Sequence, residues 1–352
     1  MITLSIFSNI HQWLLGVLPD ESTVHVVELI TIALVYLALF ALTGLFLVYA
    51  ERRIAGFFQL RLGPNRVGPF GLFQTLADAL KLVSKELTGT VKADKFLYHL
   101  APYFVIISAL VTLSIIPFSQ EIQVFDIDIG IFFFAAVSSL GVIGIFLAGW
   151  SSNNKYSLIG GMRTGLQMVS YELSIGMAIV TIVLLSGTLQ MSQIIEAQRH
   201  TWNIFQGHIS SLIAFMVIMI ASTAETNRTP FDLVEAESEL GAGFHTEYSG
   251  MNFAYFFLAE FINMFISATI IVVLFFGGWL SPFGITDGIP FMGAFWFILK
   301  VAFIIFLFMW FRWTFPRLRI DQVLKLEWKY LLPINIVNVV FMAFLVWMGL
   351  TL

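Results

Sequence analysis

The sequence predicts an all-α protein: a polytopic bundle of about eight transmembrane helices with long cytoplasmic loops and one interfacial amphipathic helix. Two observations predict it. Of the 352 residues, 59% are hydrophobic and only 11% are charged, whereas soluble domains carry about 25% charged residues. Apolar stretches of about 20 residues, the length that crosses a bilayer, recur along the chain. So apolar a chain cannot cover itself with polar side chains, and we expect it to fold in lipid.

Eight apolar stretches are long enough to span a bilayer, and we expect them to form a single membrane domain, residues 1–352. They lie at residues 28–49, 97–117, 130–150, 162–186, 207–225, 252–276, 291–312 and 331–350. Of the 18 Lys and Arg residues, all except Arg199 and Lys300 fall in, or at the edges of, the loops after the first, third, fifth and seventh stretches. Because basic loops stay in the cytoplasm, we expect both termini in the periplasm. No basic segment opens the chain, so we expect no cleaved signal peptide.

Cysteine is absent from the sequence. This excludes thiolate-held iron–sulfur clusters, disulfides and covalently attached c-type haem in this chain. The six histidines lie outside the middles of the apolar stretches, so axial pairs for a membrane haem are not expected. We therefore expect no flavin, haem, iron–sulfur cluster or metal site here, and any electron carrier would belong to a partner.

The first cytoplasmic loop, residues 51–96, begins with ERRIAGFFQLRLGPNRVGPFG. Two Gly-Pro pairs fix turns, and arginines alternate with phenylalanines around them. A quinone needs an apolar wall for its tail and polar groups at its headgroup, so this composition suits the mouth of a quinone channel. A basic loop that binds lipid headgroups explains it equally well.

The same loop contains a predicted amphipathic helix at residues 70–86, where apolar residues at helical spacing share one face and charged residues another. Such a helix lies on the bilayer surface, and it can also wall a cavity. The segment GPNRVG lacks the Lys and Ser/Thr of a P-loop, and no GxGxxG follows a strand. We therefore expect no NADH site in this chain.

Charged residues inside apolar spans are costly and mark proton pathways or partners. Glu172, Glu225 and Glu260 lie in or at the ends of predicted spans, and Lys300 lies inside the seventh. Small residues beside Glu172 let a neighbouring helix approach closely, and Asn263 shares a helical face with Glu260. The alternatives are static hydrogen-bonded acids, and a lysine that snorkels to the interface instead of pairing with a carboxylate.

The acidic loop after the fifth span, residues 225–250, is the densest feature of the sequence. Its charged residues are Glu225, Arg228, Asp232, Glu235, Glu237, Glu239 and Glu247. If residues 231–240 are helical, Asp232, Glu235 and Glu239 share one face. Crowded carboxylates do not all ionise, so some would hold protons near neutral pH, as a proton relay requires. The alternative is a solvated acidic loop, but the apolar residues between the acids indicate partial burial.

Four segments together resemble one family, the H subunits of bacterial NADH–quinone oxidoreductase, respiratory complex I. They are ERRIAGFFQLRLGPNRVGPFGLFQTLADALKLVSKE (51–86), SNNKYSLIGGMRTGLQMVSYELSIGM (152–177), AETNRTPFDLVEAESELGAGFHTEYSGMNFAYFFLAEF (224–261) and RWTFPRLRIDQVLKLEWKYLLP (312–333). With the eight spans, the resemblance covers nearly the whole chain. It implies a membrane subunit that forms the membrane end of the quinone channel, docks the peripheral arm and couples quinone reduction to proton translocation.

The resemblance also implies roles for individual residues. The proton-relay residues of the family fall on Glu172, Glu225, Asp232, Glu235, Glu237, Glu239, Glu260 and Lys300. The quinone-channel residues fall on Arg52, Arg61, Arg228, Phe244 and Arg317.

The resemblance further implies a substrate, partners and a location. The substrate is a quinone, either ubiquinone or menaquinone. The partners are other complex I subunits, namely the peripheral-arm subunits that carry the terminal iron–sulfur cluster and small neighbouring membrane subunits, in the bacterial inner membrane; no nucleic-acid partner is expected. Three other functions remain open: the equivalent subunit of an energy-converting hydrogenase, a stand-alone proton or cation transporter, and a scaffold without chemistry of its own.

Overall fold

The structure is a computed structural model that describes residues 21–120, 122–233, 240–282, 284 and 292–350. Within these ranges every regular element is a helix. Eight spans in the described part of the chain are long and apolar enough to cross a membrane, which confirms the predicted fold class and the expectation of about eight spans. They are α2 (Glu21–Phe58), α4 (Lys95–Ser114), α5 (Gly130–Ser151), α6 (Lys155–Ser186), α9 (His208–Glu225), α11 (Gly250–Phe275), α12 (Met292–Thr314) and a final composite helix, Ile320–Trp347.

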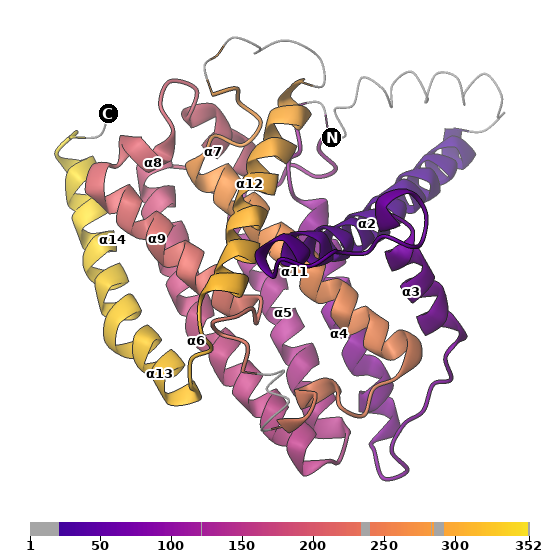
Figure 1. Ribbon diagram of the computed structural model, residues 1–352. Coiled ribbons are helices and arrows are strands. Elements are labelled where there is room, and N and C mark those ends of the chain that lie inside the picture. The colour runs from indigo at the N-terminus through magenta and orange to yellow at the C-terminus, as the bar shows by residue number, and fades with distance from the viewer. Residues whose placement is uncertain (1–20, 121, 234–239, 283, 285–291, 351–352) are drawn as a thin grey trace.

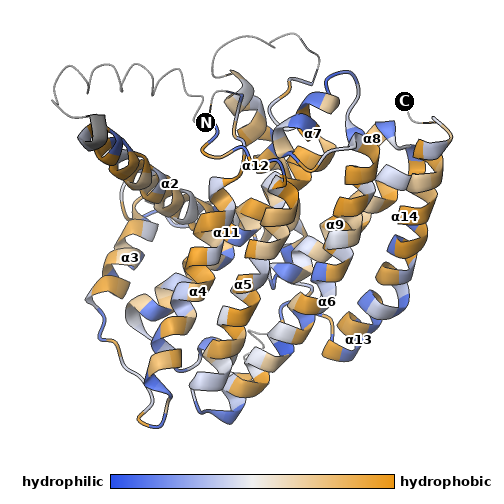
Figure 2. Ribbon diagram, turned by 180° about the vertical axis from the view of Figure 1, so that it is seen from behind, coloured by the Kyte–Doolittle hydropathy of each residue, from blue (hydrophilic) through white to orange (hydrophobic). Residues whose placement is uncertain are grey.

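Helix α11 is the centre of the bundle. Its most apolar window is 72% buried, against 11% for α2, and α11 packs against α2, α4, α9 and α12. In Figure 1, α2 leans out on one side of the bundle and α14 stands at the opposite edge. Figure 2 shows hydrophobic residues along the bodies of the helices and many of the hydrophilic residues near their ends, the distribution that a bilayer favours.

Helix α2 is longer than its apolar stretch. It continues to Phe58, so Glu51 and Arg52 lie in its last turns and not in a loop. Hydropathy marks where a helix leaves the lipid, and a helix needs no lipid to continue. The chain then folds back on Gly56: the Arg61 N–H donates to the Gly56 carbonyl at 2.9 Å, and a Cβ on Gly56 would lie 2.9 Å from the Arg61 oxygen.

The connections contain short helices. In the first loop, η1 (Pro69–Gly71) is followed by α3 (Gln74–Ser84), so the amphipathic helix predicted within residues 70–86 is present but shorter. Gly71 has a φ of 76° and separates the two helices. On the remaining connections lie α7 (Met191–Ala197), α8 (Asn203–Gln206) and η2 (Gly243–His245).

The final composite helix begins earlier than its apolar stretch predicts. It consists of α13 (Ile320–Lys325), the π-helical turn η3 (Leu326–Leu331) and α14 (Leu332–Trp347). Pro333 explains the π turn, because proline has no N–H and its ring crowds the carbonyl four residues earlier. A widened turn lets the helix continue past this position. As a result, Glu327 lies inside a span that the sequence predicts to start after it.

Helices α5 and α6 meet through glycine. A Cβ on Gly161 would lie 3.0 Å from the Cα of Gly149, whereas a Cβ on Gly176 would meet no atom within 4 Å. The small-residue face predicted beside Glu172 therefore makes a close helix contact at one end and has open space at the other.

This difference gives a matched pair of variants. We expect Gly161→Ala to destabilise the protein by about 1–3 kcal/mol, because an added methyl forces two helix backbones apart. Gly176→Ala should be neutral or stabilise slightly, since Ala favours the helix where there is room. Thermal unfolding of the purified protein in detergent measures both. Equal melting temperatures for the two variants would contradict the close contact.

Candidate functional site

Three cavities adjoin at the first turn of α11. The apolar cavity, about 430 Å³, lies between α2, α3 and α11. The polar cavity, about 1100 Å³, lies between α3, the acidic loop and the end of α12. The acid pocket, about 50 Å³, lies between α9, η2 and α11. Phe253 lines all three, Lys81 and Leu82 line both larger cavities, and His245 lines the polar cavity and the acid pocket.

The apolar cavity is walled by aliphatic and aromatic side chains from three helices. Leu45 and Val48 of α2 face Leu82 of α3 and Leu258 of α11 across it. Arg52 also lines it, and its guanidinium binds the carboxylate of Asp78 on α3 at 2.5 Å. Such a slot suits an elongated apolar molecule. A polar group at one end of that molecule would lie next to Lys81 and Leu82, which line both the apolar and the polar cavity.

The polar cavity has a basic wall. Lys81, Lys85, Arg312 and Arg317 line it, together with Asp232. The guanidinium of Arg317 binds the Asp232 carboxylate at 3.2 Å. Cations arranged around a cavity stabilise negative charge that develops on a bound molecule.

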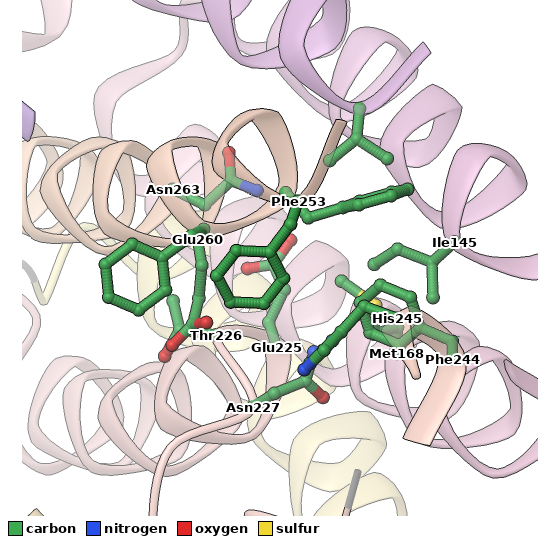
Figure 3. A pocket seen from close by; sticks show the side chains of 13 residues that line it. Ile145, Met168, Glu225, Thr226, Asn227, Phe244, His245, Phe253, Glu260 and Asn263 are labelled. Atoms are coloured by element: carbon green, nitrogen blue, oxygen red, sulfur yellow. The ribbon is translucent and has the colours of Figure 1, made fainter. Parts of the chain in front are cut away.

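The acid pocket brings together two of the predicted relay acids. Figure 3 shows Glu225 from the end of α9 and Glu260 from α11, with Asn263 one turn further along α11 and His245 on η2. Glu172 on α6 is close enough to Glu225 for the two carboxyl groups to interact electrostatically. The three intramembrane acids that the sequence singles out therefore belong to one cluster.

Gln167 fixes the loop that follows α9. Its fully buried amide donates to the carbonyls of Ala224 at 2.8 Å and Phe231 at 3.0 Å. The Leu318 N–H donates to the Pro230 carbonyl at 2.9 Å, which joins this loop to the one after α12. These bonds anchor the segment between Glu225 and Asp232, because they supply donors to its backbone carbonyls.

Arg228 is the most buried charge of that segment. It is 1% exposed, forms an ion pair with Glu51, and lies 3.4 Å from the carboxylate of Glu260. Its guanidinium also covers the ring of Phe261 at 4.5 Å. Arg312 binds the other oxygen of Glu51. The ion-pair chain Arg312–Glu51–Arg228–Glu260 therefore runs from the polar cavity to the acid pocket.

The predicted quinone-channel residues do not gather in one place. Arg52 lines the apolar cavity and Arg317 the polar cavity, while Phe244 lines the acid pocket. Arg228 is buried within the ion-pair chain. Arg61 is exposed and binds Gln59 of its own turn at 2.5 Å. Their roles in binding a quinone stay predictions.

The acidic loop differs from the predicted helix where it is described. Residues 231–233 are not helical, and the Leu233 N–H bonds to the Phe231 carbonyl two residues back, so Asp232 lies on no helical face. The remaining acids of that face, Glu235 and Glu239, lie outside the described residues together with Glu237.

Lys300 lies at the other end of α11. Its ammonium donates to the carbonyls of Phe276, Gly278 and Leu280 at 2.6, 3.0 and 2.6 Å, and it faces the Trp202 ring at 5.0 Å. The side chain is 8% exposed, so it does not snorkel. It supplies donors to carbonyls after the end of a helix, where backbone donors run out. Its pairing with a carboxylate stays a prediction.

Sequence reasoning missed four residues of this region: Glu51, Phe253, Arg312 and His245. Glu51 precedes two arginines and resembles an ordinary loop acid, and Arg312 ends an apolar stretch in the way a snorkelling residue does. Phe253 is one phenylalanine among 37. The sequence carries no local signal for Glu51, because a helix that continues beyond the lipid places successive polar residues on different faces.

The His245 ring is enclosed by aromatic side chains, with Phe244 at 4.9 Å and Phe253 at 5.4 Å between ring centroids. Burial lowers the pKa of His245 to about 4, because an apolar site disfavours the charged ring. The ring is therefore neutral at pH 7, between the polar cavity and the acid pocket.

This lowered pKa predicts a pH-dependent stability. The unfolded chain binds a proton near pH 6.5, and the folded chain binds it only near pH 4. The contribution of His245 is thus fully present above about pH 6.5 and is lost as the pH falls toward 4. We expect His245→Asn to reduce the loss of thermal stability over this range, and His208→Asn, which changes an exposed histidine, to leave it unchanged. Identical pH profiles for wild type and H245N would contradict the burial of the ring.

The comparisons with known proteins point to one family. The family model described as NADH dehydrogenase matches residues 30–343. The chain is similar to the H subunit of NADH-quinone oxidoreductase from Bacteroides fragilis, with 53% identity over 98% of each chain. It is 51% identical to the H subunit from Bacteroides thetaiotaomicron over 97% of this chain and 98% of that one. It is 49% identical to the H subunit from Brevibacillus brevis over 85% of this chain and 87% of that one.

Proposed function

Because the chain belongs to the family of NADH-quinone oxidoreductase H subunits, we propose that its three adjoining cavities bind a quinone and couple the reduction of that quinone to proton translocation. The chain is a membrane subunit of complex I, so its activity is that of the assembled enzyme. The observation that carries the proposal is the meeting of an apolar slot, a basic cavity and an acid pocket at Phe253.

The quinone tail lies in the apolar cavity and its headgroup reaches the polar cavity past Lys81 and Leu82. The tail gains from leaving water along Leu45, Val48 and Leu258. Both ubiquinone and menaquinone have a long apolar tail, so the residues that line the apolar cavity do not distinguish between the two quinones.

Quinone reduction consumes two electrons and two protons, and the ring oxygens become negative before they are protonated. Arg317 and the lysines of the polar cavity stabilise that charge. Arg52 fixes α3 against α2 through Asp78, which keeps the slot open. The electrons come from the peripheral arm, docked on the cytoplasmic loops, since a chain without cysteine holds no thiolate-bound cluster.

The ion-pair chain carries the effect of this charge to the acid pocket. A negative headgroup attracts Arg312 and weakens its pair with Glu51, so Glu51 binds Arg228 more strongly. Arg228 then stabilises the charge on Glu260 less, and Glu260 takes up a proton more readily. Arg228 and Glu260 lie 3.4 Å apart, and in a buried site a change in such a close cation strongly changes the proton affinity of the carboxylate. The protons pass on through Glu225 and Glu172, and Glu235, Glu237 and Glu239 of the acidic loop supply them from the cytoplasm.

Two other functions are less well supported. The relatives that match this chain over nearly their whole length are named as subunits of NADH-quinone oxidoreductase. This favours the quinone enzyme over a hydrogenase. A transporter that works alone needs no basic cavity at the cytoplasmic loops. We place the protein in the bacterial inner membrane, with both termini in the periplasm and small membrane subunits beside it.

Phe253 tests the quinone path. We expect Phe253→Trp to narrow the junction between the two larger cavities and to raise the KM for a long-chain quinone by about tenfold, because lost binding appears mainly in KM. A short-chain quinone should be affected less. NADH-dependent reduction of both quinones by the assembled complex measures this, with Phe303→Trp on the exposed face of α12 as control. An unchanged KM for both quinones would refute the assignment of this junction.

Glu225 tests the relay. We expect Glu225→Gln to lower coupled turnover by about a hundredfold, the range seen when a proton-transfer group is removed, and to lower proton translocation with it. The control is Glu196→Gln, since Glu196 lies on the short helix α7, away from the pocket, and pairs with Arg199 just after that helix. Turnover and proton translocation are measured together in membrane vesicles. Wild-type values of both in E225Q would remove Glu225 from the mechanism.

A further inference from the structure

Another buried acid lies away from the three cavities, between α6 and the final composite helix. Glu327 is 0% exposed and belongs to the π turn η3. The hydroxyl of Ser174 on α6 donates to its Oε1 at 2.5 Å. Within the described residues, its Oε2 is buried and accepts no hydrogen bond. No described ion pair includes it, and neither the relay nor the quinone path proposed above uses it.

The surroundings of Glu327 are polar. The side-chain amide of Asn335 donates to the Ser174 carbonyl at 3.2 Å, and no described group donates to its buried Oδ1. The Tyr171 hydroxyl donates to the Val323 carbonyl at 3.0 Å. Two buried acceptors in this seam, Glu327 Oε2 and Asn335 Oδ1, thus lack a hydrogen among the described residues.

The described charged and titratable groups around the seam do not supply a counter-charge. Tyr171 of α6 interacts electrostatically with Glu327, and its neighbour in sequence, Glu172, is itself an acid. On the composite helix, Asp321, Lys325 and Lys329 are exposed. A buried carboxylate with one hydroxyl as its partner is costly, and such a group becomes neutral by binding a proton.

We propose that Glu327 is a proton-binding site of the membrane domain, occupied at rest, and that it exchanges its proton when quinone reduction changes the charge of the acid cluster. The second half rests on the proposed function, and the first half does not. The bound proton turns Oε2 from an acceptor without a partner into a donor. Of the two buried acceptors, only Asn335 Oδ1 then lacks a donor among the described residues. On release, the Oε2–H bond breaks, the proton passes to water, and the carboxylate keeps the Ser174 hydrogen bond.

The local backbone suits such an exchange. A π turn is a wide and irregular turn that occurs frequently at functional sites, and here it places the acid against α6. Helix α6 also carries Glu172, two residues before Ser174, so a change of charge at Glu172 acts on the helix that holds the Ser174 hydroxyl. The seam and the acid cluster thus share one structural element.

Infrared spectroscopy of the assembled complex tests the bound proton. Wild type should show a carboxylic-acid C=O band that shifts in D₂O, and this band should be absent in Glu327→Gln. Ser174→Ala removes the hydroxyl and should shift the band to higher frequency, which keeps the test informative if E327Q assembles poorly. Asp321→Asn, an exposed acid of the same composite helix, should leave the band in place. A band that is retained in E327Q and unmoved in S174A would overturn the site.

Reaction-induced difference spectra test the exchange. Adding NADH and quinone should change the Glu327 band in wild type, and E327Q should translocate fewer protons per electron pair while its uncoupled turnover stays within about twofold of wild type. Glu327→Asp should restore part of the ratio, which a packing role would not. An unchanged band together with a wild-type ratio in E327Q would refute the exchange. If E225Q has wild-type coupling while the Glu327 band is confirmed, the relay fails and the proton-binding site stands.

Discussion

A guanidinium buried away from water must be paired, and Arg228 is buried almost completely. The desolvation of an unpaired charge exceeds what packing alone returns, so the positions of Glu51 and Glu260 are constrained by the need to neutralise it. Glu51 is on α2, Glu260 is on α11 and Arg228 follows α9. One buried cation therefore joins three spans that are distant in sequence, and Arg312 attaches a fourth through the second oxygen of Glu51.

The functional surfaces follow from this arrangement. Holding the end of α2 against α11 leaves room for the apolar cavity between them and α3, and the polar cavity lies next to it, at the acidic loop and the end of α12. On the other side of the same chain, Glu260 faces the acid pocket with Glu225. A charge that appears beside Arg312 in the polar cavity is therefore three ion pairs away from the carboxylate of Glu260. A redox-linked proton pump needs such a connection, because its chemistry and its proton path are in different places.

Much of the fold could be predicted from the sequence, since eight apolar stretches and the distribution of basic residues determine a membrane bundle by solvation alone. The grouping of Glu172, Glu225 and Glu260 could also be expected, because an acid inside an apolar span is costly unless it faces the interior of the bundle and other polar groups. Helix ends were not: α2 continues past the lipid and η3 carries the last span over Pro333, so Glu51 and Glu327 seemed to be loop residues. The partition of the arginines among a slot, a cavity and a buried ion pair depends on tertiary contacts that no local pattern encodes.

If Arg228 transmits charge between Glu51 and Glu260, a double-mutant cycle on these two acids detects the coupling. Proton translocation driven by quinone reduction would be compared in Glu51→Gln, Glu260→Gln and the double variant. If the two acids act through one guanidinium, the effects are strongly non-additive, and the double variant is no worse than the more severe single one. Effects that multiply as for independent sites would show that the two carboxylates act separately, and the connection between the quinone and the acid pocket would have to be sought elsewhere.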